Sequence, residues 1–282
     1  MATWFITGAT RGLGAEIARH ALKSGHDVAV GARRIDDLPG DLRDAGRCCP
    51  VTLDVTDQAQ IDRAVARTVE RFGTIDVLVN NAGRVLVGAL EEVTDAEARS
   101  LFDLNVFGLI NVTRAVLPTM RAAGTGKIVH IGSRAGFAGE PGLSIYSATK
   151  FAVAGIGEAL AAELAPFGIQ SMVVKLGAFR TDHFDPSSMS ISAARLPAYD
   201  DTVAHLLRDA VAAGIHSQPG DPVRGAALIV EVTEGETLPS HLLVGGDVYE
   251  RLELKNATVA EHNAAWRDKA MATAYDDIGS TR

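Results

Sequence analysis

Aromatic residues and cysteines are scarce in this sequence of 282 residues. Only 5% of its residues are aromatic although 47% are hydrophobic, so aliphatic side chains and alanine must form the interior. Such an interior suits helices packed against a parallel sheet. The two cysteines, Cys48 and Cys49, are adjacent, and adjacent cysteines neither bridge readily nor have the spacing of a metal site. We therefore expect reduced thiols, no metal centre and a cytoplasmic location.

Two further features are missing, and each argues against a class of partner. The formal net charge is -8 and lysine and arginine form no cluster, which argues against a nucleic-acid partner. No apolar run is long enough to span a bilayer, so we expect no membrane association. A signal peptide is not expected either, because residues 3–7 already have a strand pattern and a glycine turn follows directly.

Short apolar runs alternate with segments of helical spacing along the chain. Strands are predicted at residues 3–7, 27–31, 51–54, 75–80, 127–132, 169–176 and 242–244. This alternation, with right-handed crossovers, predicts an α/β fold: a single-domain Rossmann-type doubly wound parallel sheet of about seven strands, with helices on both faces.

Cap and breaker residues place the helix ends and the domain boundary. Thr94 and Glu97 have the spacing of a capping box, and Pro166 with Gly168 predicts the end of the helix that contains Tyr146. Residues 178–197 are serine-rich and irregular, which is typical of a functional lid or a disordered loop. We assign residues 1–245 to one domain and residues 246–282 to a helical C-terminal extension.

A glycine-rich turn lies between the first predicted strand and the first helix. Glycine permits tight turns and close approach of a ligand, and free N–H groups at a helix start attract anions. The pyrophosphate of a dinucleotide is the expected ligand, although a plain strand-to-helix turn would also explain the glycines. The candidate residues are Gly8, Thr10, Arg11, Gly12, Leu13 and Gly14.

The end of the second predicted strand indicates which dinucleotide is preferred. An NAD site usually has a carboxylate there for the ribose 2′-hydroxyl, whereas this strand runs into Arg33 and Arg34. Arg33 with Arg11 suits a 2′-phosphate, so we expect NADP, with NAD the less favoured cofactor. Two solvated arginines are the alternative interpretation.

Tyr146 and Lys150 are four residues apart at the start of a predicted helix and share a face. An ammonium beside a phenol lowers the pKa of the phenol, which would make Tyr146 a usable proton donor and acceptor. Ser133 follows the preceding strand, where the ligand crevice of a doubly wound sheet lies, and its hydroxyl could hold a substrate oxygen.

Taken together, these motifs resemble the short-chain dehydrogenase/reductase superfamily over almost the whole chain. The matching residues are Thr7-Gly8-x-x-x-Gly12-x-Gly14, Asp54-Val55, Asn80-Asn81-Ala82-Gly83, Asn105, Ser133 and Tyr146-Ser147-Ala148-Thr149-Lys150. The resemblance implies an oxidoreductase of the ketoreductase or alcohol dehydrogenase type, which exchanges a hydride between NADP(H) and a small carbonyl or secondary alcohol.

The resemblance also implies the roles of individual residues. Asn105, Ser133, Tyr146 and Lys150 would form a catalytic tetrad, with Tyr146 as the acid/base, Lys150 on the cofactor ribose and Asn105 anchoring a water. The remaining cofactor contacts implied are Asp54 and Val55 at the adenine, Asn81, Ala82 and Gly83 behind the cofactor, and Gly177, Phe179 and Thr181 near the nicotinamide. One departure is Leu176, which stands where the family usually has proline and removes a fixed backbone angle. The segment after it looks like the 17β-hydroxysteroid dehydrogenase-like branch.

Other interpretations are a sugar-nucleotide epimerase, for which the chain is short, and an NADP-sensing protein, which would typically lack Tyr146 or Lys150. The substrate is not identified, although Phe137, Leu143, Phe184, Met189 and Tyr199 could line an apolar pocket or belong to core and surface. The apolar helices at 96–122 and 146–166 suggest a homo-oligomer. A dimer is favoured over a tetramer, since the extension could block a second interface; it could instead pack over residues 178–197.

Overall fold

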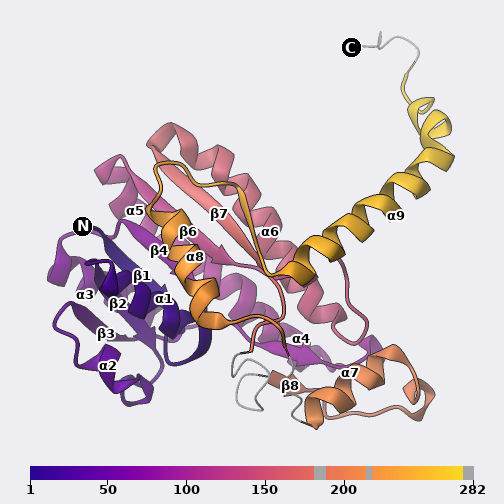
Figure 1. Cartoon of the computed structure of the whole chain (residues 1–282), viewed down its shortest axis with the longest axis horizontal. Coiled ribbons are helices and arrows are strands. Elements are labelled where there is room, and N and C mark those ends of the chain that lie inside the picture. Colours follow the sequence, from indigo (N-terminus) through magenta and orange to yellow (C-terminus); the bar gives the residue numbers. More distant parts are fainter. Residues whose placement is uncertain (181–188, 214–217, 276–282) are drawn as a thin grey trace.

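A seven-stranded parallel sheet forms the centre of the computed structural model, which describes residues 1–180, 189–213 and 218–275 (Figure 1). The spatial order is β3-β2-β1-β4-β6-β7-β9. The strands are β1 (Thr3–Thr7), β2 (Asp27–Ala32), β3 (Cys48–Thr52), β4 (Val77–Asn80), β6 (Gly126–Ile131), β7 (Ile169–Leu176) and β9 (His241–Val244). The predicted doubly wound fold is confirmed, and the strand order reverses between β1 and β4.

Strand boundaries follow burial on both faces of the sheet. All five residues of β1 are buried, as expected for a parallel strand covered by helices on either side. Strand β3 begins earlier than predicted, because Cys48 pairs with Val28 and the chain leaves the sheet after Thr52. Pro50 is tolerated there because β3 is an edge strand. Both cysteines are free and buried in β3, as expected.

Helices cover both faces and enclose two apolar cores. The helices α1 (Gly12–Lys23) and α8 (Pro222–Glu234) pack together over one face, around residues such as Ile17 and Ile229. The other face carries α3 (Gln58–Phe72), α5 (Leu109–Ala123) and α6 (Ser144–Leu164). A short helix, α2 (Gly40–Arg43), packs beside β3. Helix α6 leads through the turn η5 (Ala165–Phe167) to Gly168, which confirms the predicted end.

The helix predicted over residues 96–122 is not uniform. It comprises α4 (Asp95–Phe102), a π-helical turn η3 (Asp103–Gly108) and then α5. The capping box of Thr94 and Glu97 is confirmed. Length and composition would let Asp95–Ala123 cross a membrane, so the expectation of no sufficiently long apolar run is wrong. Its α5 part packs against α3, β4 and β6, which makes it a core helix of this fold.

A second, two-stranded sheet was not predicted. Strand β5 (Val85–Val87) pairs in parallel with β8 (Met189–Ile191), which lies inside the predicted lid at 178–197. After β8 come the turn η7 (Pro197–Tyr199) and helix α7 (Val203–Ala212). We call residues 189–213 the flap; the rest of the predicted lid, residues 181–188, lies outside the described residues.

The C-terminal extension forms one long helix, α9 (Gly246–Met271), which projects away from the body (Figure 1). Its first turn is packed, with Val248 fully buried, whereas residues 253–275 are all exposed. The expectation that the extension packs over residues 178–197 is therefore not met beyond its first turns, because residues that touched the flap would be covered.

The contact between α6 and β7 gives a test of how tightly the fold positions its helices. A Cβ on Gly157 would collide with Val173, whereas a Cβ on Gly155, two residues earlier in α6, would meet nothing within 4 Å. We expect Gly157→Ala to destabilise the protein by about 1–3 kcal/mol through overpacking. Gly155→Ala, the matched control, should stabilise it by about 0.5–1 kcal/mol. Chemical denaturation measures both, and equal stability of the two variants would contradict this packing.

Candidate active site

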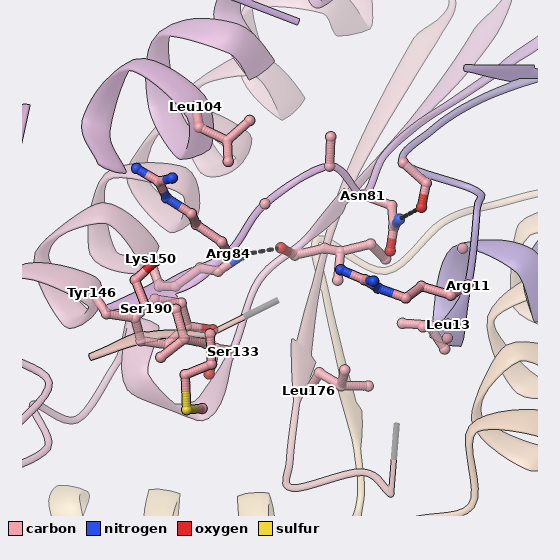
Figure 2. Close-up of a pocket in the computed structure, with 18 of the residues that line it drawn as sticks. Arg11, Leu13, Asn81, Arg84, Leu104, Ser133, Tyr146, Lys150, Leu176 and Ser190 are labelled. Atoms are coloured by element: carbon pink, nitrogen blue, oxygen red, sulfur yellow. Dashed lines mark hydrogen bonds between the residues drawn. The ribbon is translucent and has the colours of Figure 1, made fainter. Parts of the chain in front are cut away.

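A large cavity of about 780 Å³ lies at the carboxyl ends of the strands, where the order of the sheet reverses. Ligands of open α/β sheets bind at this point. Every described residue expected to bind the cofactor lines it: Gly8, Thr10, Arg11, Gly12, Leu13, Gly14, Arg33, Arg34, Asp54, Val55, Asn81, Ala82, Gly83, Tyr146, Lys150, Gly177 and Phe179. Thr181 lies outside the described residues. Figure 2 shows Arg11 and Leu13 at one end and Tyr146 and Ser133 at the other.

The glycine loop is held against the end of β4 by a close backbone approach. The Asn81 amide donates to the carbonyl oxygens of Thr7 and Gly8, both at 2.9 Å, and Thr7 Oγ1 accepts from two backbone N–H groups of the Asn81-Ala82 turn. Gly8 has φ 69°, and a Cβ on Gly14 would collide with the Asn81 amide and with Gly8 O. Only glycine fits both positions.

The start of α1 is a site for an anion. The side chain of its N-cap residue, Arg11, makes no capping hydrogen bond, and the first residues of the helix, Gly12, Leu13 and Gly14, line the cavity together with the positive end of the helix dipole. A pyrophosphate fits such a helix start. The residues present therefore fit a dinucleotide, because the loop geometry admits a ligand at close range and no capping side chain competes for the donors.

The two arginines after β2 differ in their surroundings. Arg34 donates to Asp37 at 2.9 Å, so this carboxylate, which also lines the cavity, already has a cationic partner. Arg33 is exposed and makes no hydrogen bond or ion pair within the described residues. The other nearby carboxylate, Asp54, accepts from the N–H and hydroxyl of Thr56 at 2.9 and 2.7 Å. Arg33 is thus the cation best placed to meet an anionic group at this end of the cavity.

Ser133, Tyr146 and Lys150 come together at the other end of the cavity. Ser133 caps the turn η4 (Arg134–Gly136) after β6, and its hydroxyl accepts from Ala135 N at 3.1 Å. Tyr146 lies in the first turn of α6 and lines the same end of the cavity as Ser133. Lys150 lies one turn further on; its ammonium donates to Ile131 O at 2.8 Å and stands 5.8 Å from the centroid of the Tyr146 ring.

Burial controls the ionisation of this pair. It raises the pKa of Tyr146 to about 12, although the Ser133 hydroxyl and the charge of Arg134 act to lower it. Burial also lowers the pKa of Lys150 to about 8. The expectation that Lys150 lowers the pKa of the tyrosine is therefore not met here, because desolvation of the phenol outweighs nearby positive charge.

Asn105, the fourth predicted catalytic residue, does not line the cavity. Its side chain is buried in the π-helical turn η3, where its amide exchanges hydrogen bonds of 3.0 Å with the backbone of Arg84. The amide also donates to the hydroxyl of Thr149, next to Lys150, at 3.2 Å. Asn105 therefore joins the segment after β4 to the helix that carries Tyr146 and Lys150.

Hydrogen bonds from the C-terminal helix hold the segment after β7 in place. Asp247, in the first turn of α9, accepts from Ala178 N at 2.9 Å and from Arg134 at 2.8 Å. Gly177 donates to Val244 O at 2.9 Å, and its lack of a Cβ makes room for the Asp247 carboxylate. These bonds fix the loop geometry that Leu176, in place of proline, left in doubt. Asp247 and Arg134 were not predicted, and only their positions next to glycines and Ser133 hinted at them.

The apolar end of the cavity only partly matches the expected set. Leu143 and Met189 line it, whereas Tyr199 donates to Glu91 on the outside and Phe137 contacts Lys175. Phe184 lies outside the described residues. The lining residues that the sequence did not reveal include several from β5 and the flap: Val85, Val87, Ser190, Leu207 and Val211.

Comparisons with known proteins agree with this geometry. The sequence model of the short chain dehydrogenase family matches residues 2–190. The chain is 36% identical over 273 residues to the oxidoreductase BOA17 of Botryotinia fuckeliana, covering 96% of this chain and 98% of that protein. It resembles the crystal structure of a short-chain dehydrogenase from Streptomyces avermitilis with a TM-score of 0.89 and 40% identity, covering 97% of this chain and 100% of the other.

A more distant solved structure is actinorhodin polyketide ketoreductase with NADPH, at a TM-score of 0.72 and 33% identity over 88% of this chain and 97% of the other. The family match covers more than half of the chain and includes the glycine loop, Asn105, Ser133, Tyr146 and Lys150. This protein is therefore a member of the short-chain dehydrogenase family of oxidoreductases.

Proposed function

We propose that this protein interconverts a small carbonyl compound and a secondary alcohol with NADP(H), and that Tyr146 is its proton donor and acceptor. The observation that carries the proposal is the placement of the Tyr146 hydroxyl beside Ser133, in the same cavity as the glycine loop and the start of α1. When bound, the nicotinamide cofactor supplies or accepts the hydride. The finer resemblance to the 17β-hydroxysteroid dehydrogenase-like branch stays a prediction.

The chain's own residues orient the substrate and move one proton. Ser133 is fixed by its bond from Ala135 N–H, so its hydroxyl can hold the carbonyl oxygen within reach of Tyr146. Tyr146 then donates its proton to that oxygen during reduction and takes it back during oxidation. Because burial keeps the phenol protonated at neutral pH, the reduction direction starts from the form that can donate. Lys150 supplies positive charge that stabilises the phenolate left behind.

NADP is the proposed cofactor because of the charges after β2. Arg33 is exposed and lines the cavity, no carboxylate stands at the end of β2, and Asp37, which also lines the cavity, is paired with Arg34. A guanidinium suits a phosphate. The NADPH bound to the actinorhodin ketoreductase is consistent with this preference.

We also propose a homo-oligomer, with a dimer favoured. Phe107, in the η3 turn between α4 and α5, and Phe151, in α6, are about half exposed, on the two helical segments expected to pair. Exposed aromatic residues on neighbouring helices are typical of a surface that a second copy covers.

Replacing Tyr146 by phenylalanine tests the catalytic proposal. Tyr146→Phe removes the proton donor but keeps the ring, so turnover of any ketone that the wild type reduces should fall by about 10²–10⁴-fold. Binding of NADPH, measured by fluorescence titration, should stay close to that of the wild type. Turnover near the wild-type value in this variant would refute the role of Tyr146.

Replacing Arg33 by alanine tests the choice of cofactor. A charge-assisted contact contributes about 1.5–3 kcal/mol, so Arg33→Ala should weaken NADP binding by about tenfold or more and leave NAD binding nearly unchanged. Arg34→Ala is the matched control, since Arg34 is already paired with Asp37. Calorimetric titration with both cofactors gives the comparison, and an equal loss for NADP and NAD would count against the proposal.

The lowered pKa of Lys150 predicts the pH dependence of reduction. Below about pH 8 the ammonium is charged and stabilises the phenolate that forms; above it the charge is lost and turnover should fall. The phenol itself, with a pKa of about 12, remains protonated through this range. A kcat profile for reduction, run beside a stability profile over the same range, checks the prediction. A rate that stays level to about pH 10 would contradict it.

A further inference from the structure

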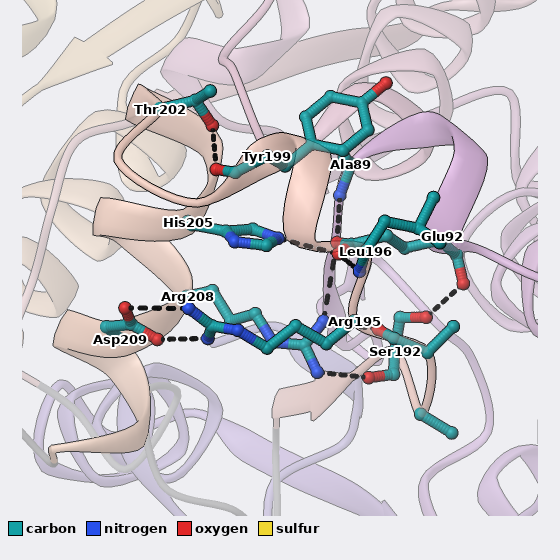
Figure 3. Close-up of polar contacts among 12 residues, drawn as sticks. Ala89, Glu92, Ser192, Arg195, Leu196, Tyr199, Thr202, His205, Arg208 and Asp209 are labelled. Carbon is teal, nitrogen blue, oxygen red and sulfur yellow. Dashed lines mark hydrogen bonds and ion pairs between the residues drawn. The ribbon is translucent and has the colours of Figure 1, made fainter.

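The flap is fastened to the body around a buried carboxylate that the proposed reaction does not use. Glu92 ends the short turn η2 (Leu90–Glu92) after β5, and its side chain is 0% exposed. A hydrogen bond joins it to His205 and an ion pair joins it to Arg208; both residues are on α7 of the flap, and their side chains are only 2% and 12% exposed. Figure 3 shows these side chains converging on Glu92. A buried carboxylate requires compensating interactions, because desolvation of a charge is costly.

Four donors satisfy the two oxygens of Glu92. One oxygen accepts from Leu196 N at 2.9 Å and faces His205 Nε2 at 2.6 Å. The other accepts from Ala89 N at 2.9 Å and from Arg208 at 3.4 Å. Burial would raise the pKa of Glu92, but the bonds from Leu196, His205 and Ala89 outweigh it and lower the pKa to about 2. Glu92 is therefore a carboxylate at every working pH.

Arg208 extends the contact along the flap. Its guanidinium donates to Ser192 O at 2.9 Å and to Ala194 O at 2.6 Å, while Leu196 N binds Glu92 directly. The hydroxyl of Ser192 also donates to the backbone oxygen of Glu92. Glu92 and Arg208 thus form hydrogen bonds with backbone groups of Ser192, Ala194 and Leu196, in a stretch without regular secondary structure.

Other charges surround this contact, and one of them, Glu97 of α4, accepts from Ala193 N of the flap at 3.3 Å. His205 Nδ1 faces Asp200 at 3.1 Å, and Arg195 bridges Asp200 and Asp209 at 3.0 and 2.7 Å. These exposed pairs order the flap internally, whereas Glu92 is the one fully buried charge that the body offers to the flap among the residues that the structure describes. Exposed pairs contribute little, so the buried one should dominate the placement of the flap.

The same helix that binds Glu92 also forms a wall of the cavity. His205 and Arg208 lie one turn apart on α7, and Leu207 and Val211, also one turn apart, line the cavity that contains Tyr146. Met189 and Ser190 of β8 line it as well. Rotation or displacement of α7 would therefore move these lining side chains relative to Tyr146.

We propose that Glu92 is a positioning residue of the substrate site: through Arg208 and the Leu196 N–H it fixes the flap wall against which the non-reacting part of the substrate binds. The expected effect on catalysis rests on the proposed carbonyl reduction, whereas the attachment of the flap to Glu92 does not depend on that proposal. Stability alone is a poor explanation of the pair, because a buried ion pair is often no better than apolar packing of the same volume. A carboxylate that binds four donors does determine how α7 and residues 192–196 are oriented relative to the body.

Glu92→Gln tests the fastening without reference to catalysis. Glutamine keeps the shape but presents an amide N–H₂ to two of the four donors and removes the charge opposite Arg208. We expect backbone amides of residues 192–196 to exchange hydrogen with solvent about tenfold faster or more, since each unsatisfied buried group costs about 1–3 kcal/mol. The matched control is Glu91→Gln, the neighbouring acid, which reaches the flap only through the exposed Tyr199 hydroxyl.

Kinetics with two ketones test the positioning. For benzylacetone, a ketone with a bulky apolar phenyl group, Glu92→Gln should raise KM by about tenfold with a smaller change in kcat. Acetone, too small to reach the wall, should show little change in KM, and NADPH affinity should be unaffected. Arg208→Met, which keeps an apolar stem, should repeat this split, and the double variant should show no additional loss.

The outcomes separate the two proposals. If the wild type reduces neither ketone, the proposed function fails, while hydrogen exchange still decides whether Glu92 holds the flap. If exchange at residues 192–196 is the same in Glu92→Gln, Glu91→Gln and wild type, the fastening is wrong. If exchange rises but KM for both ketones changes equally, Glu92 holds the flap without setting the substrate wall. If Glu92→Gln does not fold, Arg208→Met provides the same comparison.

Discussion

The close approach of two backbone segments at the ends of β1 and β4 sets the conditions for the rest of the site. Gly8 and Gly14 leave no room for a side chain beside Asn81 and Ala82, and Asn81 and Thr7 stitch the two segments together. This contact directs α1 so that its uncapped start faces the cavity. Any larger residue would separate the strands' ends and remove the anion site, so the glycines are a requirement of packing before they are one of ligand binding.

The fold and the residues at the strand ends could be predicted because they depend on local signals. Apolar runs covered on both faces predict parallel strands, and a cap such as Thr94 or a stop such as Gly168 marks a helix end. Strands β5 and β8 were not predicted, because each has three residues and is stabilised only by pairing with a strand about a hundred positions away. The role of Glu92 was not predicted for the same reason. Leu90-Glu91-Glu92 has the pattern of a solvated turn, and the residues that contact the Glu92 carboxylate, Leu196, His205 and Arg208, are distant in the sequence.

The ionisation of the active site shows why residue types alone predict chemistry incompletely. Tyr146 and Lys150 have the expected spacing, yet desolvation acts on both in the direction of the neutral form, so each is less easily charged than in water. The pair then has a proton to donate at neutral pH and a lysine whose charge is sensitive to mild alkali. Periodicity places the two side chains on one face of α6, but it contains no information on how deeply that face is buried.

The first turn of α9 belongs to the active site even though the rest of the helix does not. Asp247 occupies the space left open by Gly177 and bonds both to Ala178 and to Arg134, the neighbour of Ser133. Proline would have fixed the backbone at position 176 through its own ring; here a carboxylate from another element fixes the next residues from outside. A boundary between residues 245 and 246, natural from composition, therefore cuts through a contact that joins the loop after β7 to the loop before α6. Because Arg134 also lowers the pKa of Tyr146, the position of α9 is coupled to the proposed proton donor through one ion pair.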